Sequence, residues 1–256
     1  MDRYKTICLD LDGTVYKGNQ AILESVAFIR TLQESGIEPY FITNNSSRTR
    51  TEQRQKLQKL GVLTTESHIM TTAIASATHC AQQFAGKTVQ MIGESGLREA
   101  LVAEGIHIVA QGGEVVIMGI DRQITYEKLA HVCLAIRNGA EFIATNGDLS
   151  VPNEIGLVPG NGAFLELVRA STGIAPTIIG KPQSYMLEFI RQQSGARKEE
   201  MIMIGDNYET DILSGIRYGI DTLHLEGGVT SREEVAAHSE VPTYMFKTLA
   251  EWRYER

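Results

Sequence analysis

Two aspartates, Asp10 and Asp12, stand two positions apart in the segment Asp-Leu-Asp-Gly-Thr near the start of the chain. The segment follows a short apolar run, so we expect it at the carboxyl end of a buried strand, where ligands bind in open α/β sheets. In extended backbone the two side chains point to the same side, and neighbouring carboxylates repel each other unless a cation or a shared proton relieves them. The pair therefore predicts a site for Mg²⁺ or a similar hard cation. For this motif alone, a solvated turn is the alternative, since Asp and Gly are common in turns.

Donors suited to phosphate oxygens follow two other apolar runs. Thr43, Asn44 and Asn45 come after the run PYFI, and their hydroxyl and amide groups donate hydrogen bonds without adding charge. Lys181 follows the run PTII within Gly-Lys-Pro, and its ammonium group can neutralise a carboxylate and a phosphate together.

A second group of carboxylates comes after the very apolar run MIMIG. Asp206 and Asn207 follow it directly, and Asp211 stands five residues beyond Asp206. These side chains add hard oxygen ligands of the kind that Mg²⁺ prefers. Polar residues thus follow four apolar runs, a pattern that solvated loops explain poorly.

The composition is that of an ordinary globular protein. Of 256 residues, 43% are hydrophobic and 21% are charged. The net charge of -7 argues against a nucleic acid or an anionic membrane as the main partner. The three cysteines are far apart and form no CxxC pair, which predicts neither a disulfide framework nor a zinc site. Since no signal peptide or membrane span is recognisable, we expect a cytoplasmic protein.

Short runs rich in Ile, Val and Phe alternate with segments of helical period along the whole chain. This alternation predicts parallel strands joined by crossover helices, an α/β fold. The segment from 87 to 176 continues the pattern and is long enough for a second domain. Composition marks no boundary, so a single continuous sheet remains the alternative.

The motifs, taken together and in order, resemble those of the haloacid dehalogenase-like superfamily of aspartyl-nucleophile phosphohydrolases. The matching segments are DLDGT, the strand-end Thr43, GKP and GDNYETD. Within the superfamily the chain is most similar to the subgroup of the nucleotide phosphatase NagD, p-nitrophenyl phosphatases and pyridoxal phosphate or phosphoglycolate phosphatases, through TNNSSR, FIATNGD, PGNGAF and IIGKPQ. The resemblance implies a Rossmann-like three-layer core with a parallel sheet, formed by residues 1–77 and 178–256, and an inserted α/β cap, residues 78–177.

The resemblance also implies the catalytic roles. Asp10 is the nucleophile that takes the phosphoryl group, and its carboxylate binds Mg²⁺. Asp12 protonates the leaving oxygen and then deprotonates the hydrolytic water, while its backbone carbonyl ligates the metal. Asp206 completes the metal ligands and Asp211 orients them. Lys181 pairs with Asp10 and the phosphate, which is bound by the remaining polar residues, Thr43, Asn44, Asn45 and Asn207.

We therefore expect a Mg²⁺-dependent phosphatase that hydrolyses small phosphorylated metabolites such as sugar phosphates or nucleotides. The resemblance places a specificity loop in the cap at residues 146–153. Two alternatives remain: a phosphotransferase or mutase that uses the same nucleophile, and a non-catalytic module that binds phosphate on an aspartate. The sequence leaves open the physiological substrate and the oligomeric state, a homo-oligomer included.

Overall fold

The computed structural model describes residues 3–153 and 155–252. Their contacts divide the chain into two compact units, each assembled from separate segments. The first unit comprises Met1–Thr43, Arg50–Met70 and Lys181–Arg256, and the second comprises Asn44–Thr49 and Thr71–Gly180. The division into a catalytic core and a specificity cap, with boundaries at 77/78 and 177/178, stays a prediction about function.

The first unit contains a six-stranded sheet with the strand order β15-β14-β13-β1-β4-β5. Strand β1 lies inside the sheet and pairs in parallel with β13 and β4. Five residues in β1 and five in β13 are all buried, as expected for strands covered on both faces. The bounds are β1 Thr6–Asp10, β4 Tyr40–Thr43, β5 Ile69–Thr71, β13 Met201–Gly205, β14 Asp221–Leu225 and β15 Tyr244–Phe246.

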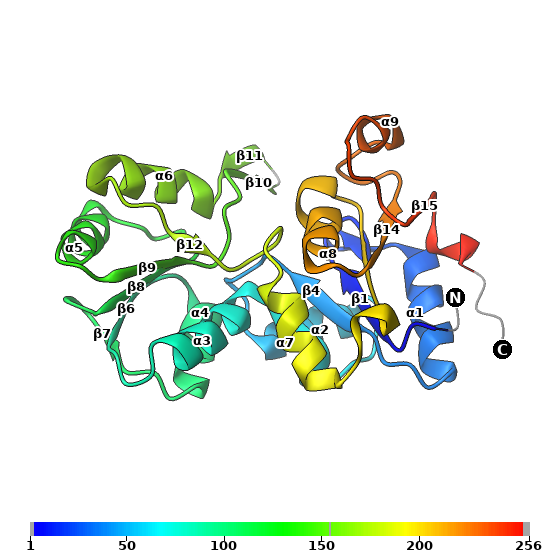
Figure 1. The fold of residues 1–256 in the computed structure, drawn as a ribbon, viewed down its shortest axis with the longest axis horizontal. Coiled ribbons are helices and arrows are strands. Elements are labelled where there is room, and N and C mark those ends of the chain that lie inside the picture. Colours follow the sequence, from blue (N-terminus) through cyan, green and yellow to red (C-terminus); the bar gives the residue numbers. More distant parts are fainter. Residues whose placement is uncertain (1–2, 154, 253–256) are drawn as a thin grey trace. The chain divides into compact units, whose positions relative to one another are not determined.

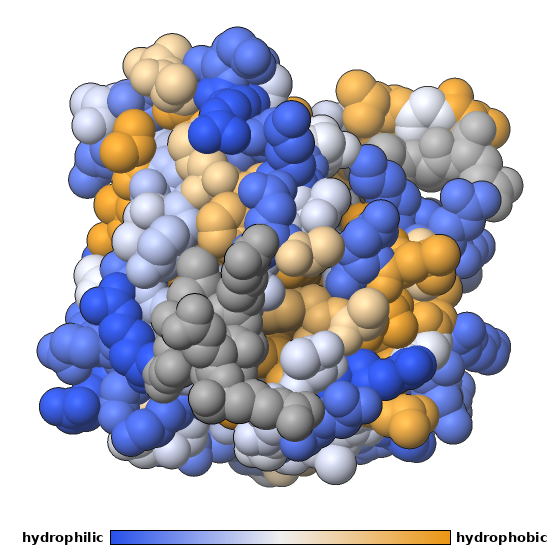
Figure 2. Space-filling model, turned by 90° about the vertical axis from the view of Figure 1, so that its right-hand side faces the viewer, coloured by the Kyte–Doolittle hydropathy of each residue, from blue (hydrophilic) through white to orange (hydrophobic). Residues whose placement is uncertain are grey.

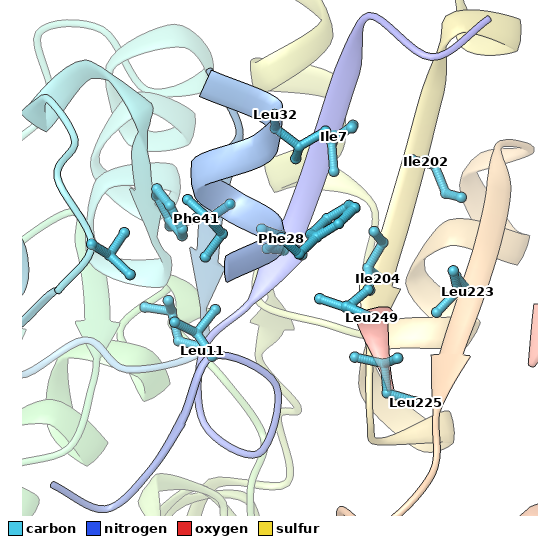
Figure 3. Packing of buried hydrophobic residues seen from close by; sticks show 14 of the residues in the cluster. Ile7, Leu11, Phe28, Leu32, Phe41, Ile202, Ile204, Leu223, Leu225 and Leu249 are labelled. Atoms are coloured by element: carbon cyan, nitrogen blue, oxygen red, sulfur yellow. The ribbon is translucent and has the colours of Figure 1, made fainter. Parts of the chain in front are cut away.

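Helices follow the strands of this unit, namely α1 Leu23–Glu34, α2 Arg50–Lys59, α7 Tyr185–Ser194 and α8 Leu213–Tyr218. Phe28 and Leu32 recur at helical spacing on α1 and pack with Ile7, Phe41 and Ile204 from the strands (Figure 3). This packing fixes β1 and its neighbours, and so the position of the residues at their carboxyl ends.

The second unit contains a five-stranded parallel sheet with the order β12-β9-β8-β6-β7. Helices α5 and α6 contact each other and share a core with β8 and β9, and α3 and α4 form a second contacting pair (Figure 1). The strands are β6 Val89–Ile92, β7 Ile108–Val109, β8 Val115–Met118, β9 Glu141–Ala144 and β12 Thr177–Ile178; the helices are α3 Thr72–Gln83, α4 Ser95–Ala103, α5 Tyr126–Arg137 and α6 Asn161–Thr172.

Shorter elements complete the two units. Two antiparallel hairpins are formed by β2 Tyr16–Lys17 with β3 Gln20–Ala21, and by β10 Ser150–Asn153 with β11 Gly156–Pro159. One π-helical turn, Tyr208–Ile212, precedes α8, and the short helix α9 spans Arg232–Ala236. Single 3₁₀ turns occur at Glu66–His68, Lys198–Glu200 and Leu249–Glu251.

The prediction of an α/β fold with parallel sheets is confirmed. Two features differ from what the sequence suggests. The strand that precedes Gly180-Lys181-Pro182, β12, belongs to the five-stranded sheet, because it pairs with β9. Lys181 is therefore the first residue of the last segment of the first unit, and it does not follow a strand of that unit's sheet. In addition, part of the expected specificity loop forms the β10–β11 hairpin.

The surface mixes hydrophilic residues with smaller hydrophobic areas on the face shown in Figure 2. Among the described residues no helix is both long and apolar enough to cross a membrane. All three cysteines are buried and unpaired. Cytoplasmic localisation stays a prediction.

Candidate active site

A cluster of buried charges lies at the carboxyl ends of the central strands of the first unit. Asp10, the last residue of β1, is 6% exposed, and Asp206 directly follows the neighbouring strand β13. The Nζ atom of Lys181, a residue 4% exposed, donates to Asp10 Oδ1 at 2.5 Å and to Asp211 Oδ1 at 2.6 Å. The structure therefore brings together four residues that the sequence had singled out.

The three carboxylates of this cluster are close enough to share one ligand. One oxygen each from Asp10, Asp206 and Asp211 can be chosen so that all three lie within 4.8 Å of one another. When the groups are ionised, three carboxylates against one ammonium group leave two negative charges uncompensated. A divalent cation would cancel them, and carboxylate oxygens are the ligands that Mg²⁺ prefers. The donor set of the described residues thus fits a hard divalent cation.

Burial and mutual repulsion shift the ionisation of these groups. Burial first, and then the charge of Asp211, raise the pKa of Asp10 well above its ordinary value, although Lys181 opposes the shift. The same two causes raise the pKa of Asp206 to about 6. Burial alone would lower the pKa of Lys181, but Asp10 and Asp211 hold it above its ordinary value, so that its side chain remains an ammonium ion.

Local backbone geometry makes room for the Asp206 carboxylate. Thr14 Oγ1 donates to one of its oxygens at 3.2 Å and the Val229 N–H to the other at 2.8 Å. Gly13 adopts a φ of +94°, which favours glycine, and a Cβ atom there would overlap the carboxylate. A Cβ atom at Gly228 would also overlap it. The glycine of Asp-Leu-Asp-Gly-Thr is therefore required by this close approach.

Asp211 is held by the π-helical turn that follows β13. The Asn207 N–H donates to Asp211 Oδ2 at 3.1 Å, and Thr210 Oγ1 donates to Oδ1 at 3.2 Å. The Asn207 side-chain oxygen accepts from the Glu209 N–H at 3.0 Å and caps the turn. These bonds orient the carboxylate that pairs with Lys181, and they give Asn207 a part in shaping the turn beside its expected contact with phosphate.

The remaining predicted site residues lie outside the charge cluster. Asp12 is exposed, two residues beyond the end of β1, and accepts a hydrogen bond from Tyr16 Oη at 3.2 Å. Thr43 is buried at the end of β4, directly after Ile42, which stands opposite Asp10 in the parallel register. The next residue along the chain, Asn44, belongs to the second unit.

Asn45, a predicted phosphate-binding residue, bonds to the backbone and side chain of its own loop in the second unit. Asn45 Oδ1 accepts from the Ser47 N–H at 2.9 Å, from Ser47 Oγ at 3.0 Å and from the Arg48 N–H at 3.2 Å. The Asn45 side-chain oxygen therefore stabilises the loop, a role that the sequence did not suggest.

A network of amide side chains in the second unit includes Asn44 and the predicted specificity loop. Asp148 Oδ2 accepts from the Nδ2 atoms of both Asn44, at 3.3 Å, and Asn146. Asn161 Nδ2 in turn donates to the backbone oxygens of Asn146 at 2.8 Å and Met118 at 3.2 Å. Sequence reasoning gave Asn161 no role, although the segment PGNGAF that contains it contributed to the family resemblance.

Two family models and several known relatives match the chain. Residues 7–107 match the model described as haloacid dehalogenase-like hydrolase, and residues 178–252 match the one described as HAD-hydrolase-like. The chain is 46% identical over 252 residues to the 5'-nucleotidase YutF of Bacillus subtilis, with 98% of each protein covered. It is 42% identical to the acid sugar phosphatase of Staphylococcus saprophyticus, covering 98% of this chain and 97% of that protein.

Solved structures show the same fold over nearly the full length. The crystal structure of a double mutant of the thermostable NPPase from Geobacillus stearothermophilus superposes with a TM-score of 0.93 at 43% identity, with 98% of each chain covered. Identity of this extent over the whole chain establishes common ancestry in addition to a common fold. The chain is therefore an enzyme of the haloacid dehalogenase-like hydrolase family and, within it, one of the NagD-like phosphatases.

Proposed function

We propose that this phosphatase hydrolyses small phosphorylated metabolites through a covalent phosphate on Asp10, with Mg²⁺ bound by Asp10, Asp206 and the backbone carbonyl of Asp12. The observation that supports this most is the placement of Lys181 between Asp10 and Asp211 in a buried cluster that has excess negative charge. When bound, Mg²⁺ supplies positive charge for the phosphate oxygens. Asp211 orients the cluster through its bond with Lys181.

In the first step the Asp10 carboxylate attacks phosphorus. A bond forms between a carboxylate oxygen and phosphorus, and the bond from phosphorus to the leaving-group oxygen breaks. Asp12 donates its proton to that oxygen, so the alcohol leaves neutral. Lys181 stabilises the negative charge on the phosphoryl group, which Thr43 and Asn44 hold by hydrogen bonds.

In the second step water hydrolyses the aspartyl phosphate. Asp12, now a carboxylate, takes a proton from the water as its oxygen bonds to phosphorus. The bond from phosphorus to Asp10 breaks, and inorganic phosphate and the free Asp10 carboxylate result. A covalent intermediate divides one difficult displacement into two easier ones.

The substrates are small phosphomonoesters, with nucleotides and sugar phosphates as the first classes to test. Relatives of similar identity carry the names 5'-nucleotidase, acid sugar phosphatase and NPPase. We assign the choice of leaving group to the segment 146–153, where the family resemblance places a specificity loop, with Asp148 and its amide partners as the framework of that segment.

The test is a screen of phosphorylated metabolites for phosphate release, ranked by kcat/KM because that ratio measures discrimination. We expect equal amounts of phosphate and free alcohol, loss of activity after treatment with EDTA, and recovery with Mg²⁺ but poor recovery with Ca²⁺, which prefers more ligands at longer distances. Transfer of phosphate to a second metabolite without release would favour the mutase alternative. Activity unaffected by exhaustive chelation would contradict the proposal that catalysis requires a bound metal ion.

Mg²⁺ binding is tested separately from turnover. A ligand that binds only the folded protein raises its melting temperature. We expect Mg²⁺ to raise the melting temperature of the wild type and to have little effect on that of Asp206→Asn. Asp121→Asn, which changes a buried aspartate of the second unit, is the control and should respond to Mg²⁺ like the wild type. Equal responses in all three proteins would place the metal elsewhere.

A further inference from the structure

We infer that Tyr16 is a positioning residue for Asp12, and that Gln53 positions the Tyr16 hydroxyl in turn. The inference rests on the proposed function, in which Asp12 is the general acid and base. It explains how a side chain that is exposed and lies beyond the end of β1 can keep a defined orientation.

A tight turn brings Tyr16 back beside Asp12. The carbonyl oxygen of Leu11 accepts hydrogen bonds from the N–H groups of Thr14, Val15 and Tyr16, and the Gly13 N–H donates to the Tyr16 carbonyl at 2.7 Å. The chain reverses within these residues and continues into the β2–β3 hairpin. The backbone that carries Asp12 and the backbone that carries Tyr16 are therefore fixed to each other.

The side chains continue this connection. Tyr16 Oη donates to Asp12 Oδ2 at 3.2 Å, and Gln53 Nε2 donates to Tyr16 Oη at 3.2 Å. Tyr16 and Gln53 are each 1% exposed, whereas Asp12 is exposed. Since the hydroxyl oxygen accepts from Gln53, its proton is available to Asp12. The ammonium group of Lys56 lies 3.5 Å from the centre of the Tyr16 ring, a cation–π contact that further restrains the ring.

The bond to Tyr16 has a consequence for proton transfer. It occupies one carboxylate oxygen of Asp12 and leaves the other, Oδ1, to hold the proton destined for the leaving group. Hydrogen bonds to a charged acceptor are about twice as strong as those between neutral groups. The bond therefore strengthens as Asp12 loses its proton in the first step, so in that step it stabilises the transition state more than the ground state.

This differential effect predicts a dependence on the leaving group. Esters with poor leaving groups, such as glycerol 2-phosphate, need protonation by Asp12, whereas p-nitrophenyl phosphate needs little. Tyr16→Phe should lower kcat for glycerol 2-phosphate about fivefold more than kcat for p-nitrophenyl phosphate, because a hydrogen bond to a charged group is worth about 1 kcal/mol more than one to a neutral group. KM should change little for either ester.

Two variants of Gln53 test the second link. Gln53→Glu places a second carboxylate beside the Tyr16 hydroxyl, so the proton has two competing acceptors and the dependence on leaving group should resemble that of Tyr16→Phe. Gln53→Met keeps the length of the side chain and removes the donor, and it should give an effect of the same kind but smaller. These variants keep the inference testable if Tyr16→Phe folds poorly, which thermal unfolding would show.

The experiment measures kcat and KM for both esters in the wild type, the Tyr16 and Gln53 variants, and Asp12→Asn. Proportional losses for both esters in Tyr16→Phe and Gln53→Glu, or no loss in either, would show that the contacts only support the fold and would overturn the inference. Full activity of Asp12→Asn would instead overturn the proposed role of Asp12. A strong loss in Asp12→Asn together with selective losses in the other variants is the expected result.

Discussion

The two units use the same architecture but end their strands with different chemistry. Each contains a parallel sheet with helices, and each gathers polar side chains near the carboxyl ends of strands. In the first unit these residues are charged and buried, as in Asp10 and Lys181. In the second unit the network around Asp148 consists mainly of amides and a hydroxyl, as in Thr145, Asn146 and Asn161.

Under the proposed function, we expect the difference to correspond to a division between bond-making in the first unit and substrate recognition in the second. Burying charges is costly unless they are paired, so a buried cluster with excess negative charge is suited to binding a cation, which together with Lys181 would offer positive charge to a phosphoryl group. Neutral donors and acceptors cost less to bury, and they can form hydrogen bonds that select a leaving group by its shape and polarity. We therefore expect substitutions in the first cluster to affect all substrates alike, and substitutions in the second to affect some substrates more than others.

The largest effect is expected for Asp10→Asn, which keeps the size of the side chain and removes the attacking anion. Turnover of every substrate should fall by about 10³-fold or more, because the covalent route is lost. Asp121→Asn is the matched control, since it makes the same change at a buried, ion-paired aspartate in the second unit and should leave turnover within about threefold. Similar activity of the two variants would remove the distinction between the units.

The next effect concerns stability and the pairing of Lys181. Lys181→Met leaves Asp10 and Asp211 without their buried partner, and removing one partner of a buried pair costs about 3–5 kcal/mol of unfolding free energy. Urea unfolding of the metal-free protein measures the loss. Arg169→Met, which breaks an exposed pair with Glu166 on α6, should change the free energy of unfolding far less, because solvent screens exposed pairs.

If Lys181→Met lowered the free energy of unfolding as little as Arg169→Met does, the idea of a tightly coupled cluster would be contradicted. The catalytic role of Lys181 is assessed from the same sample, since kcat should fall for all substrates in proportion.

Much of this arrangement could be predicted from the sequence, because local patterns encode it. The apolar runs before Asp10, Thr43 and Asp206 form the strands β1, β4 and β13; Asp10 and Thr43 end their strands, and Asp206 directly follows its strand. The glycine at position 13 is explained by its close approach to Asp206, which only the folded structure reveals.

The remaining features depend on contacts between distant residues. Strand β12 has two residues, and nothing in its sequence says which of two parallel sheets it joins. The bond between Tyr16 and Gln53 joins residues 37 positions apart, and hydrophobic periodicity does not report on such polar pairs. Hairpin β10–β11 contains prolines at Pro152 and Pro159, which weaken a strand pattern.

The smallest effects are expected in the second unit, within the segment 146–153. Leu149 is 63% exposed next to the β10–β11 hairpin, so Leu149→Ala should reorder the ranking of metabolites while turnover of p-nitrophenyl phosphate stays within about tenfold. Asp148→Asn removes the carboxylate that holds Asn44 and Asn146, and we expect it to reorder the ranking of metabolites as well.

Parallel measurement of kcat and KM for p-nitrophenyl phosphate and for the best metabolite checks both variants. If Leu149→Ala lowered both activities in proportion, the segment would belong to the catalytic machinery or to the fold, and the division between the two units would fail.

The most direct test of the account is chemical trapping of the phosphorylated enzyme. Borohydride reduces an acyl phosphate, so quenching during turnover and then reducing should convert the phosphorylated aspartate to homoserine, which peptide mass spectrometry locates. We predict homoserine at position 10 only, in amounts that depend on substrate and that vanish in Asp10→Asn. Steady turnover with no reduced residue at position 10, or with reduction at another carboxylate such as Asp206, would contradict the assignment of Asp10 as the nucleophile.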